Sequence, residues 1–142
     1  MDPAVAAATQ VTASDVLAAQ ARLRRYLDVT PTHYAERFGT WLKLENLQRT
    51  GSYKVRGALN ALLAARERGD DRYVITASAG NHAQGMAWAA YRLGIPAITV
   101  MPRTAPDTKV AGVAHWGATG RLHGDTYDEA KAVARELAQQ NG

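Results

Sequence analysis

One lysine, Lys54, stands where a loop gives way to a predicted helix, and both its type and its place suit amine chemistry. The loop Thr50-Gly51-Ser52-Tyr53-Lys54 precedes a helix predicted over about residues 54–68, which Ser52 can cap. A positive charge in the first helical turn opposes the helix dipole, which favours the neutral amine, a usable nucleophile or base. The simpler alternative is an exposed helical lysine, and spacing alone favours that alternative.

A second loop, Ser78-Ala79-Gly80-Asn81-His82, follows a short apolar stretch and leads straight into another predicted helix. Backbone N–H groups and the dipole at the start of a helix attract anions, and the side chains of Ser78 and Asn81 can add hydrogen bonds. The loop therefore predicts an anion site. The simpler alternative is a capped turn in which Ser78 or Asn81 is the N-cap.

The elements that must position these loops follow from apolar periodicity and turn residues. We expect helices at about 15–27, 54–68, 81–93, 106–116 and 125–139, and strands at 41–45, 73–76, 96–101 and 119–123. Strands that alternate with helices through short loops are typical of an α/β fold, a parallel sheet between layers of helices. Ligands of such folds bind at the carboxyl ends of the strands, where residues 78–82 lie. The expected core positions are Leu59, Leu62, Leu63, Trp88, Leu93 and Val113.

Composition narrows the classes of function. The chain has 142 residues, 17 basic and 13 acidic, with a net charge of +4 and no cysteine, which excludes disulfides and thiol chemistry. The basic residues form no long run and do not interleave with aromatics, so nucleic-acid binding is not expected. The histidines at 33, 82, 115 and 123 lack metal-ligand spacing. No apolar run is long enough to span a membrane and no signal peptide is recognisable, so we expect a cytoplasmic protein.

Four segments together carry a resemblance to a known family. Residues 44–58 (LENLQRTGSYKVRGA) and 76–85 (TASAGNHAQG) are two long motifs, and residues 101–110 and 123–130 continue the pattern. Together they resemble the threonine dehydratases, which are fold-type-II pyridoxal-phosphate enzymes, over about residues 14–142. The resemblance implies pyridoxal phosphate as cofactor. It also implies dehydration and deamination of L-threonine or L-serine to a 2-oxo acid and ammonia, a reaction of amino-acid metabolism that includes isoleucine biosynthesis.

The same resemblance assigns roles to residues of both loops. It implies that Lys54 forms the Schiff base with the cofactor and removes the α-proton of the substrate. Tyr53 would pack near the pyridine ring, and Asn81 would hydrogen-bond the cofactor's 3′-oxygen. The substrate carboxylate would be held by the loop residues Ser78, Ala79, Gly80, Asn81 and His82. Related serine racemases carry a second serine at the position of Ala79 as an acid/base group, so racemisation is the less favoured alternative.

The resemblance also divides the chain into two parts. Residues 1–68 would belong to the large domain of the tryptophan-synthase-β-like fold, and residues 69–142 would form its small α/β domain. The large domain would be incomplete, because the glycine-rich phosphate loop of the family does not occur before Gly142. We therefore expect this chain alone to bind the cofactor weakly or not at all. The alternatives are a non-catalytic remnant, a small α/β module that binds anions or a partner chain, and an active half that needs a separate complementing polypeptide. The protein partner would be a second copy in a homo-oligomer or that complementing chain.

Overall fold

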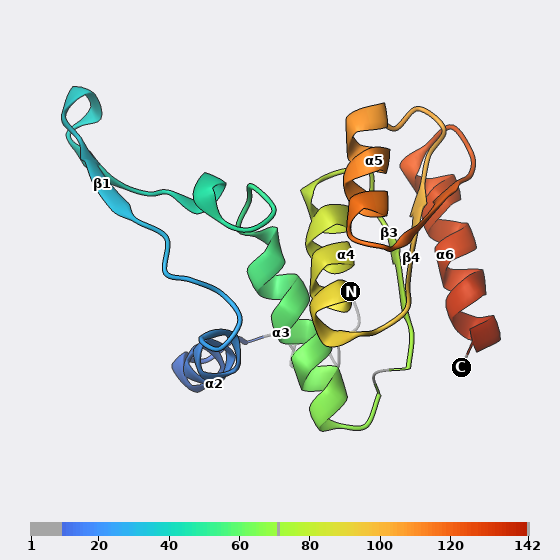
Figure 1. Cartoon of the computed structure of the whole chain (residues 1–142), viewed down its shortest axis with the longest axis horizontal. Coiled ribbons are helices and arrows are strands. Elements are labelled where there is room, and N and C mark those ends of the chain that lie inside the picture. Colours follow the sequence, from blue (N-terminus) through green and yellow to red (C-terminus); the bar gives the residue numbers. More distant parts are fainter. Residues whose placement is uncertain (1–9, 71, 142) are drawn as a thin grey trace.

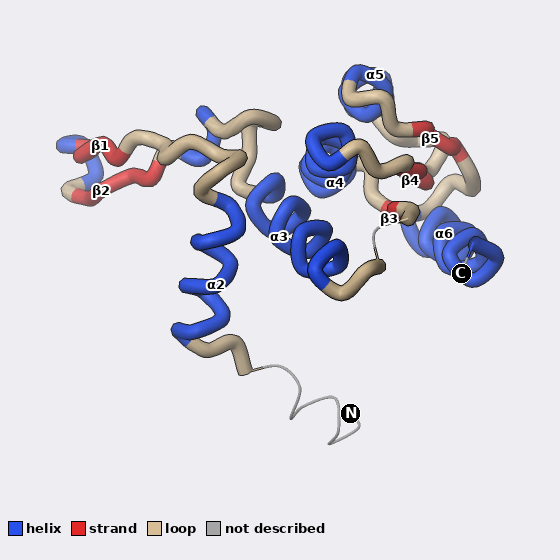
Figure 2. Tube along the Cα trace, turned by 60° about the horizontal axis from the view of Figure 1, so that its bottom comes forward, coloured by secondary structure: helices blue, strands red, loops and turns tan. Residues whose placement is uncertain are grey.

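A parallel β-sheet with helices on both faces forms one half of the molecule (Figure 1), in a computed structural model that describes residues 10–70 and 72–141. Its strands are β3 (Val74–Ala77), β4 (Ala97–Met101) and β5 (Thr119–Leu122), in the order β3-β4-β5. Figure 2 shows α4 (Asn81–Leu93) and α5 (Asp107–His115) on one side of this sheet and α6 (Tyr127–Asn141) on the other. The predicted α/β fold and its three layers are confirmed.

The N-terminal half consists of two helices joined by an extended hairpin. The elements are α2 (Ala13–Leu23), β1 (Thr32–Ala35), β2 (Thr40–Lys43) and α3 (Lys54–Glu67), with short 3-10 turns at Glu36–Phe38 and Glu45–Leu47. β1 and β2 are antiparallel, and the hairpin projects away from the sheet (Figure 1). The sequence predicted a strand near β2 and did not predict β1. β1 was missed because its residues, THYA, do not alternate between apolar and polar, and the strand is defined by its pairing with β2.

The largest apolar cluster joins α3, the helix of Lys54, to α4. Val55 and Leu59 of α3 are fully buried, and Trp88 of α4 packs in the same cluster. All six predicted core positions are buried. Burial of each large apolar side chain stabilises the fold by about 1.5–3 kcal/mol. The lysine-bearing helix α3 is therefore packed firmly against α4, the helix that follows the first strand of the sheet.

The N-terminal half also leaves large apolar side chains in solvent. Over the hairpin and its flanks, Val29, Phe38, Trp41 and Leu47 are each at least 60% exposed. Apolar groups gathered in this way are typical of surfaces that contact other polypeptide. Among the described helices, none combines the length and the apolar character that crossing a membrane requires.

Candidate active site

The loop after β3 is fixed to the sheet by its own polar groups. The backbone N–H of Ser78 donates to the carbonyl of Val100 in β4 at 3.2 Å, and the backbone N–H of Gly80 donates to Ser78 Oγ at 3.2 Å. Gly80 itself is the N-cap of α4, and no side chain caps that helix. The alternative of a turn capped by Ser78 or Asn81 is therefore wrong. The reason is that the Ser78 hydroxyl serves the loop, while Asn81 is already the first helical residue.

Lys54 is the first residue of α3, as its position in the sequence predicted. The N-cap is Tyr53 and not the predicted Ser52, although Ser52 Oγ still accepts from the backbone N–H of Lys54 at 3.4 Å. The lysine side chain is exposed, and its Nζ lies 5.1 Å from the centroid of the Tyr53 ring. A cation over an exposed aromatic face is stabilised by about 0.5–1 kcal/mol, so Tyr53 helps to hold the amine in place.

A glycine brings the two loops together. A β-carbon added at Gly85 of α4 would lie 3.1 Å from the carbonyl carbon of Lys54 and 3.1 Å from the backbone nitrogen of Val55. Such a distance is tighter than nine in ten real β-carbon contacts, so a larger residue would require the backbone of α3 to shift by a few tenths of an ångström. Glycine at this position lets the first turn of α3 rest on α4, one turn beyond the Ser78–His82 loop.

The charge of Lys54 reaches that loop. Partial burial, and next to it the positive charge of Lys54, lower the pKa of His82 below its ordinary value of 6.5. His82 is therefore mainly neutral at neutral pH, so its ring can both donate and accept a hydrogen bond. The lysine and the histidine, 28 residues apart in sequence, belong to one electrostatic environment.

Asn81 has a different partner. Its Oδ1 accepts a hydrogen bond from Nζ of Lys109, at 3.2 Å, and Lys109 lies in the first turn of α5. The sequence did not assign a role to Lys109 or to Gly85. Both lie in segments that carry the family resemblance, and that was the only signal available. Their contacts cross between helices, so only the packing of the fold reveals them.

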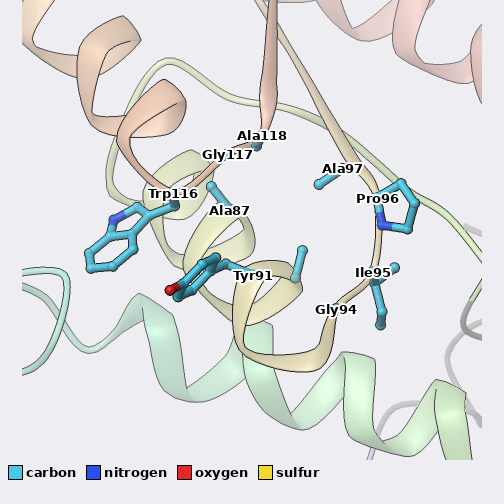
Figure 3. A pocket seen from close by; sticks show the side chains of 10 residues that line it. Ala87, Tyr91, Gly94, Ile95, Pro96, Ala97, Trp116, Gly117 and Ala118 are labelled. Carbon is cyan, nitrogen blue, oxygen red and sulfur yellow. The ribbon is translucent and has the colours of Figure 1, made fainter.

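A pocket of about 230 Å³ lies at the other end of the sheet (Figure 3). Tyr91 and Trp116 stand at one side of it and Ile95 at the other, together with small residues of the chain segments that enter β4 and β5. It opens at the amino ends of the strands, whereas the Ser78–His82 loop lies at the carboxyl ends. Neither Lys54 nor any residue of the Ser78–His82 loop lines this pocket.

Comparison with known proteins identifies the family. A sequence profile described as "pyridoxal-phosphate dependent enzyme" matches residues 23–142. The chain belongs to this family of pyridoxal-phosphate-dependent enzymes. An L-threonine ammonia-lyase of Thermotoga maritima is 41% identical over 138 residues, which cover 93% of this chain and 34% of that protein. The chain thus spans about a third of the length of that relative.

Solved structures of the pyridoxal-phosphate-dependent enzyme family agree with the fold. The structure of a pyridoxal 5′-phosphate-dependent aspartate racemase matches with a TM-score of 0.87 and 36% identity, over 94% of this chain and 44% of that one. The processed form of threonine deaminase isoform 2 from Solanum lycopersicum matches with a TM-score of 0.80 and 34% identity, over 94% and 40%. The α/β fold with a parallel sheet that the resemblance implied is therefore the fold of this chain, and its structural relatives are fold-type-II enzymes.

Proposed function

We propose that this chain supplies the cofactor-bearing lysine and the substrate loop of an ammonia-lyase that converts L-threonine or L-serine to a 2-oxo acid and ammonia. The observation that carries the proposal is the contact of Gly85 with the backbone of Lys54, because it sets the lysine beside the loop that opens α4. The similarity to an L-threonine ammonia-lyase supports the choice of reaction.

The residues present fit pyridoxal phosphate. Lys54 offers an exposed primary amine, the group that reacts with an aldehyde, and the ring of Tyr53 lies beside it. The first turn of α4 has no side-chain cap, so its N–H groups can receive anionic oxygens. Asn81 adds a side-chain amide at the same place. When bound, the cofactor supplies an electron sink that stabilises negative charge at the substrate's α-carbon.

The chain's own residues then perform three tasks. Lys54 would hold the cofactor through Nζ, and the same Nζ would accept the α-proton of the substrate. The backbone N–H groups of the Ser78–His82 loop would hold the substrate carboxylate at the start of α4. His82, whose pKa is lowered by partial burial and then by the charge of Lys54, also lines that loop. Loss of the β-hydroxyl as water and hydrolysis of the carbon–nitrogen bond complete the conversion to 2-oxo acid and ammonia.

Racemisation is the second candidate, since an aspartate racemase is among the structural relatives. A racemase must return a proton from the face opposite the lysine. In this chain the loop presents Ala79 where the related serine racemases have a serine, and a methyl group has no exchangeable proton. Elimination is therefore the reaction that the loop favours.

The division into domains is part of the same proposal. We assign residues 1–68, described here from residue 10, to the large domain, and residues 69–142 to the small one. The exposed apolar side chains of the β1–β2 hairpin support this assignment, because a large domain would cover them. The α3–α4 contact is then the joint between the two domains.

A chimaera tests this function. Residues 14–142 replace the corresponding segment of the Thermotoga maritima L-threonine ammonia-lyase, and release of 2-oxo acid and of D-amino acid is measured with L-threonine and L-serine. We expect cofactor-dependent 2-oxo acid release that is lost in Lys54→Ala and kept in the matched variant Lys43→Ala. Formation of D-amino acid without 2-oxo acid would favour the racemase. A folded chimaera with neither reaction would indicate a non-catalytic module.

A further inference from the structure

Helices α4 and α5 begin side by side at the carboxyl edge of the sheet, and a side-chain hydrogen bond joins their first turns. Asn81 is the first residue of α4, and Lys109 is the third residue of α5. Nζ of Lys109 donates to Oδ1 of Asn81 at 3.2 Å. Lys109 is only partly exposed, which limits the freedom of its ammonium group.

A second contact, one helical turn further on, sets the spacing of the two helices. Gln84 follows Asn81 by three residues, and Gly112 follows Lys109 by three. A β-carbon at Gly112 would lie 3.0 Å from Cδ of the Gln84 side chain, so the glycine gives that side chain its room. Residues three apart lie on the same side of a helix. The pairs Asn81–Lys109 and Gln84–Gly112 therefore lie one helical turn apart along the contact between α4 and α5. The packing of the two helices thus places Lys109 opposite Asn81.

This hydrogen bond has a consequence for the orientation of the Asn81 amide. An asparagine amide has a carbonyl oxygen that accepts and an NH2 group that donates. An ammonium group can only donate, so it pairs with the oxygen and disfavours the flipped amide, in which two donors would face each other. With Oδ1 held by Lys109, the NH2 group is the part of Asn81 that remains for a ligand.

We propose that Lys109 is a positioning residue, which fixes the Asn81 amide so that its NH2 group donates to an anionic oxygen of the bound cofactor. The inference rests on the proposed function, in which Asn81 contacts the cofactor. It adds a residue from α5, a third helix, to the two helices that carry Lys54 and the loop. It also gives Lys109 a role through Asn81 and not through direct contact with the reacting atoms.

The first test needs no cofactor. In the ¹H–¹⁵N spectrum of the full chain, the side-chain NH2 signals of Asn81 should move in Lys109→Ala, and they should stay near their original positions in Lys109→Arg, which keeps a donor. Lys43→Ala, which removes a positive charge from the hairpin, should leave them unchanged. Backbone signals report whether each variant is folded. Asn81 signals that ignore the loss of Lys109 would overturn the inference.

The second test measures the concentration of pyridoxal phosphate that gives half-maximal borohydride-trapped label on Lys54. Lys109→Ala should raise it roughly tenfold, as loss of one charge-assisted hydrogen bond would. Asn81→Ala should raise it by a similar factor, and the double variant by no more than either single one. Effects that add in the double variant would overturn the inference, because Lys109 would then act without Asn81.

The two tests separate this inference from the function on which it rests. If neither the unaltered chain nor the chimaera that carries residues 14–142 gives label on Lys54, the proposed function fails, and the positioning role toward the cofactor fails with it. If label forms normally and Lys109→Ala changes only the NMR signals, the positioning role alone is wrong. Rescue of both readouts by Lys109→Arg supports it.

Discussion

Gly85 and Lys54 meet at backbone distance: a β-carbon on the glycine would lie 3.1 Å from the lysine's carbonyl carbon. This contact decides where the amine of Lys54 stands relative to the loop that opens α4. Core packing of Val55 and Leu59 presses the two helices together, and the missing side chain at position 85 sets how close they come.

Gly85→Ala should therefore destabilise the chain. Alanine in place of a helical glycine gains up to about 1 kcal/mol, but a methyl group forced against a backbone costs about 1–3 kcal/mol, so we expect a net loss of about 1 kcal/mol. Gly57→Ala in α3 is the matched control, since its β-carbon would meet nothing within 4 Å. It should gain about 0.5–1 kcal/mol. Urea unfolding measures both, and a stabilised Gly85→Ala would contradict the close contact.

The titration of His82 reports the nearness of Lys54. The pKa of His82 is lowered first by burial and then by the charge of Lys54. Lys54→Gln removes only the second cause, so the pKa of His82 should rise part of the way toward 6.5 and stay below it. An NMR pH titration of the His82 ring measures this change. Lys43→Gln removes a charge on the hairpin and should leave the pKa of His82 unchanged. An unchanged pKa in Lys54→Gln would show that the charge of Lys54 does not act on the Ser78–His82 loop.

Glu45 ties the segment before the lysine loop to α3. Its carboxylate accepts from Nε and Nη2 of Arg56 at 2.7 and 2.8 Å, and from Oγ1 of Thr30 at 2.5 Å. The guanidinium of Arg56 is the main cause that lowers the pKa of Glu45 from 4.5 to about 2. The unfolded chain therefore binds the proton more readily between pH 4.5 and 2. The stabilisation is complete above that window and is lost as the pH falls through it.

Glu45→Gln should accordingly cost about 1–2 kcal/mol at pH 7, and its difference from the unaltered chain should shrink toward pH 2. Urea unfolding across this range measures the difference. The same substitution at exposed Glu136 should change the free energy of unfolding by less than about 0.5 kcal/mol. A Glu45→Gln deficit that stays constant between pH 7 and 2.5 would show that the ion pair is not its source.

Local signals predicted α4 well, and nonlocal pairing explains what was missed. The helix begins and ends at the predicted residues, because the small polar loop precedes it and Gly94 adopts the left-handed conformation, φ 66°, at its end. β1 forms only because the chain returns as β2, where Tyr34 faces Trp41 with ring centroids 5.2 Å apart. The residues of β1 alone therefore do not predict this pairing with β2.

The candidate site divides in the same way. Lys54 and Asn81 stand out as residues at helix starts, so their places were predictable from turn and helix signals. Lys109 was not, since its contact with Asn81 spans 28 residues and depends on how α5 packs against α4. Gly85 likewise reads as an ordinary helical glycine until α3 is set against it.

The central claim is that Lys54 is the lysine that takes the cofactor, and covalent trapping tests it most directly. The chain is incubated with enough pyridoxal phosphate to occupy a weak site and reduced with borohydride, and the label is then mapped over its four lysines, Lys43, Lys54, Lys109 and Lys131. We predict that most of the label lies on Lys54 and falls sharply in Asn81→Ala. Label spread evenly over the four lysines, or concentrated on another one, would contradict the claim.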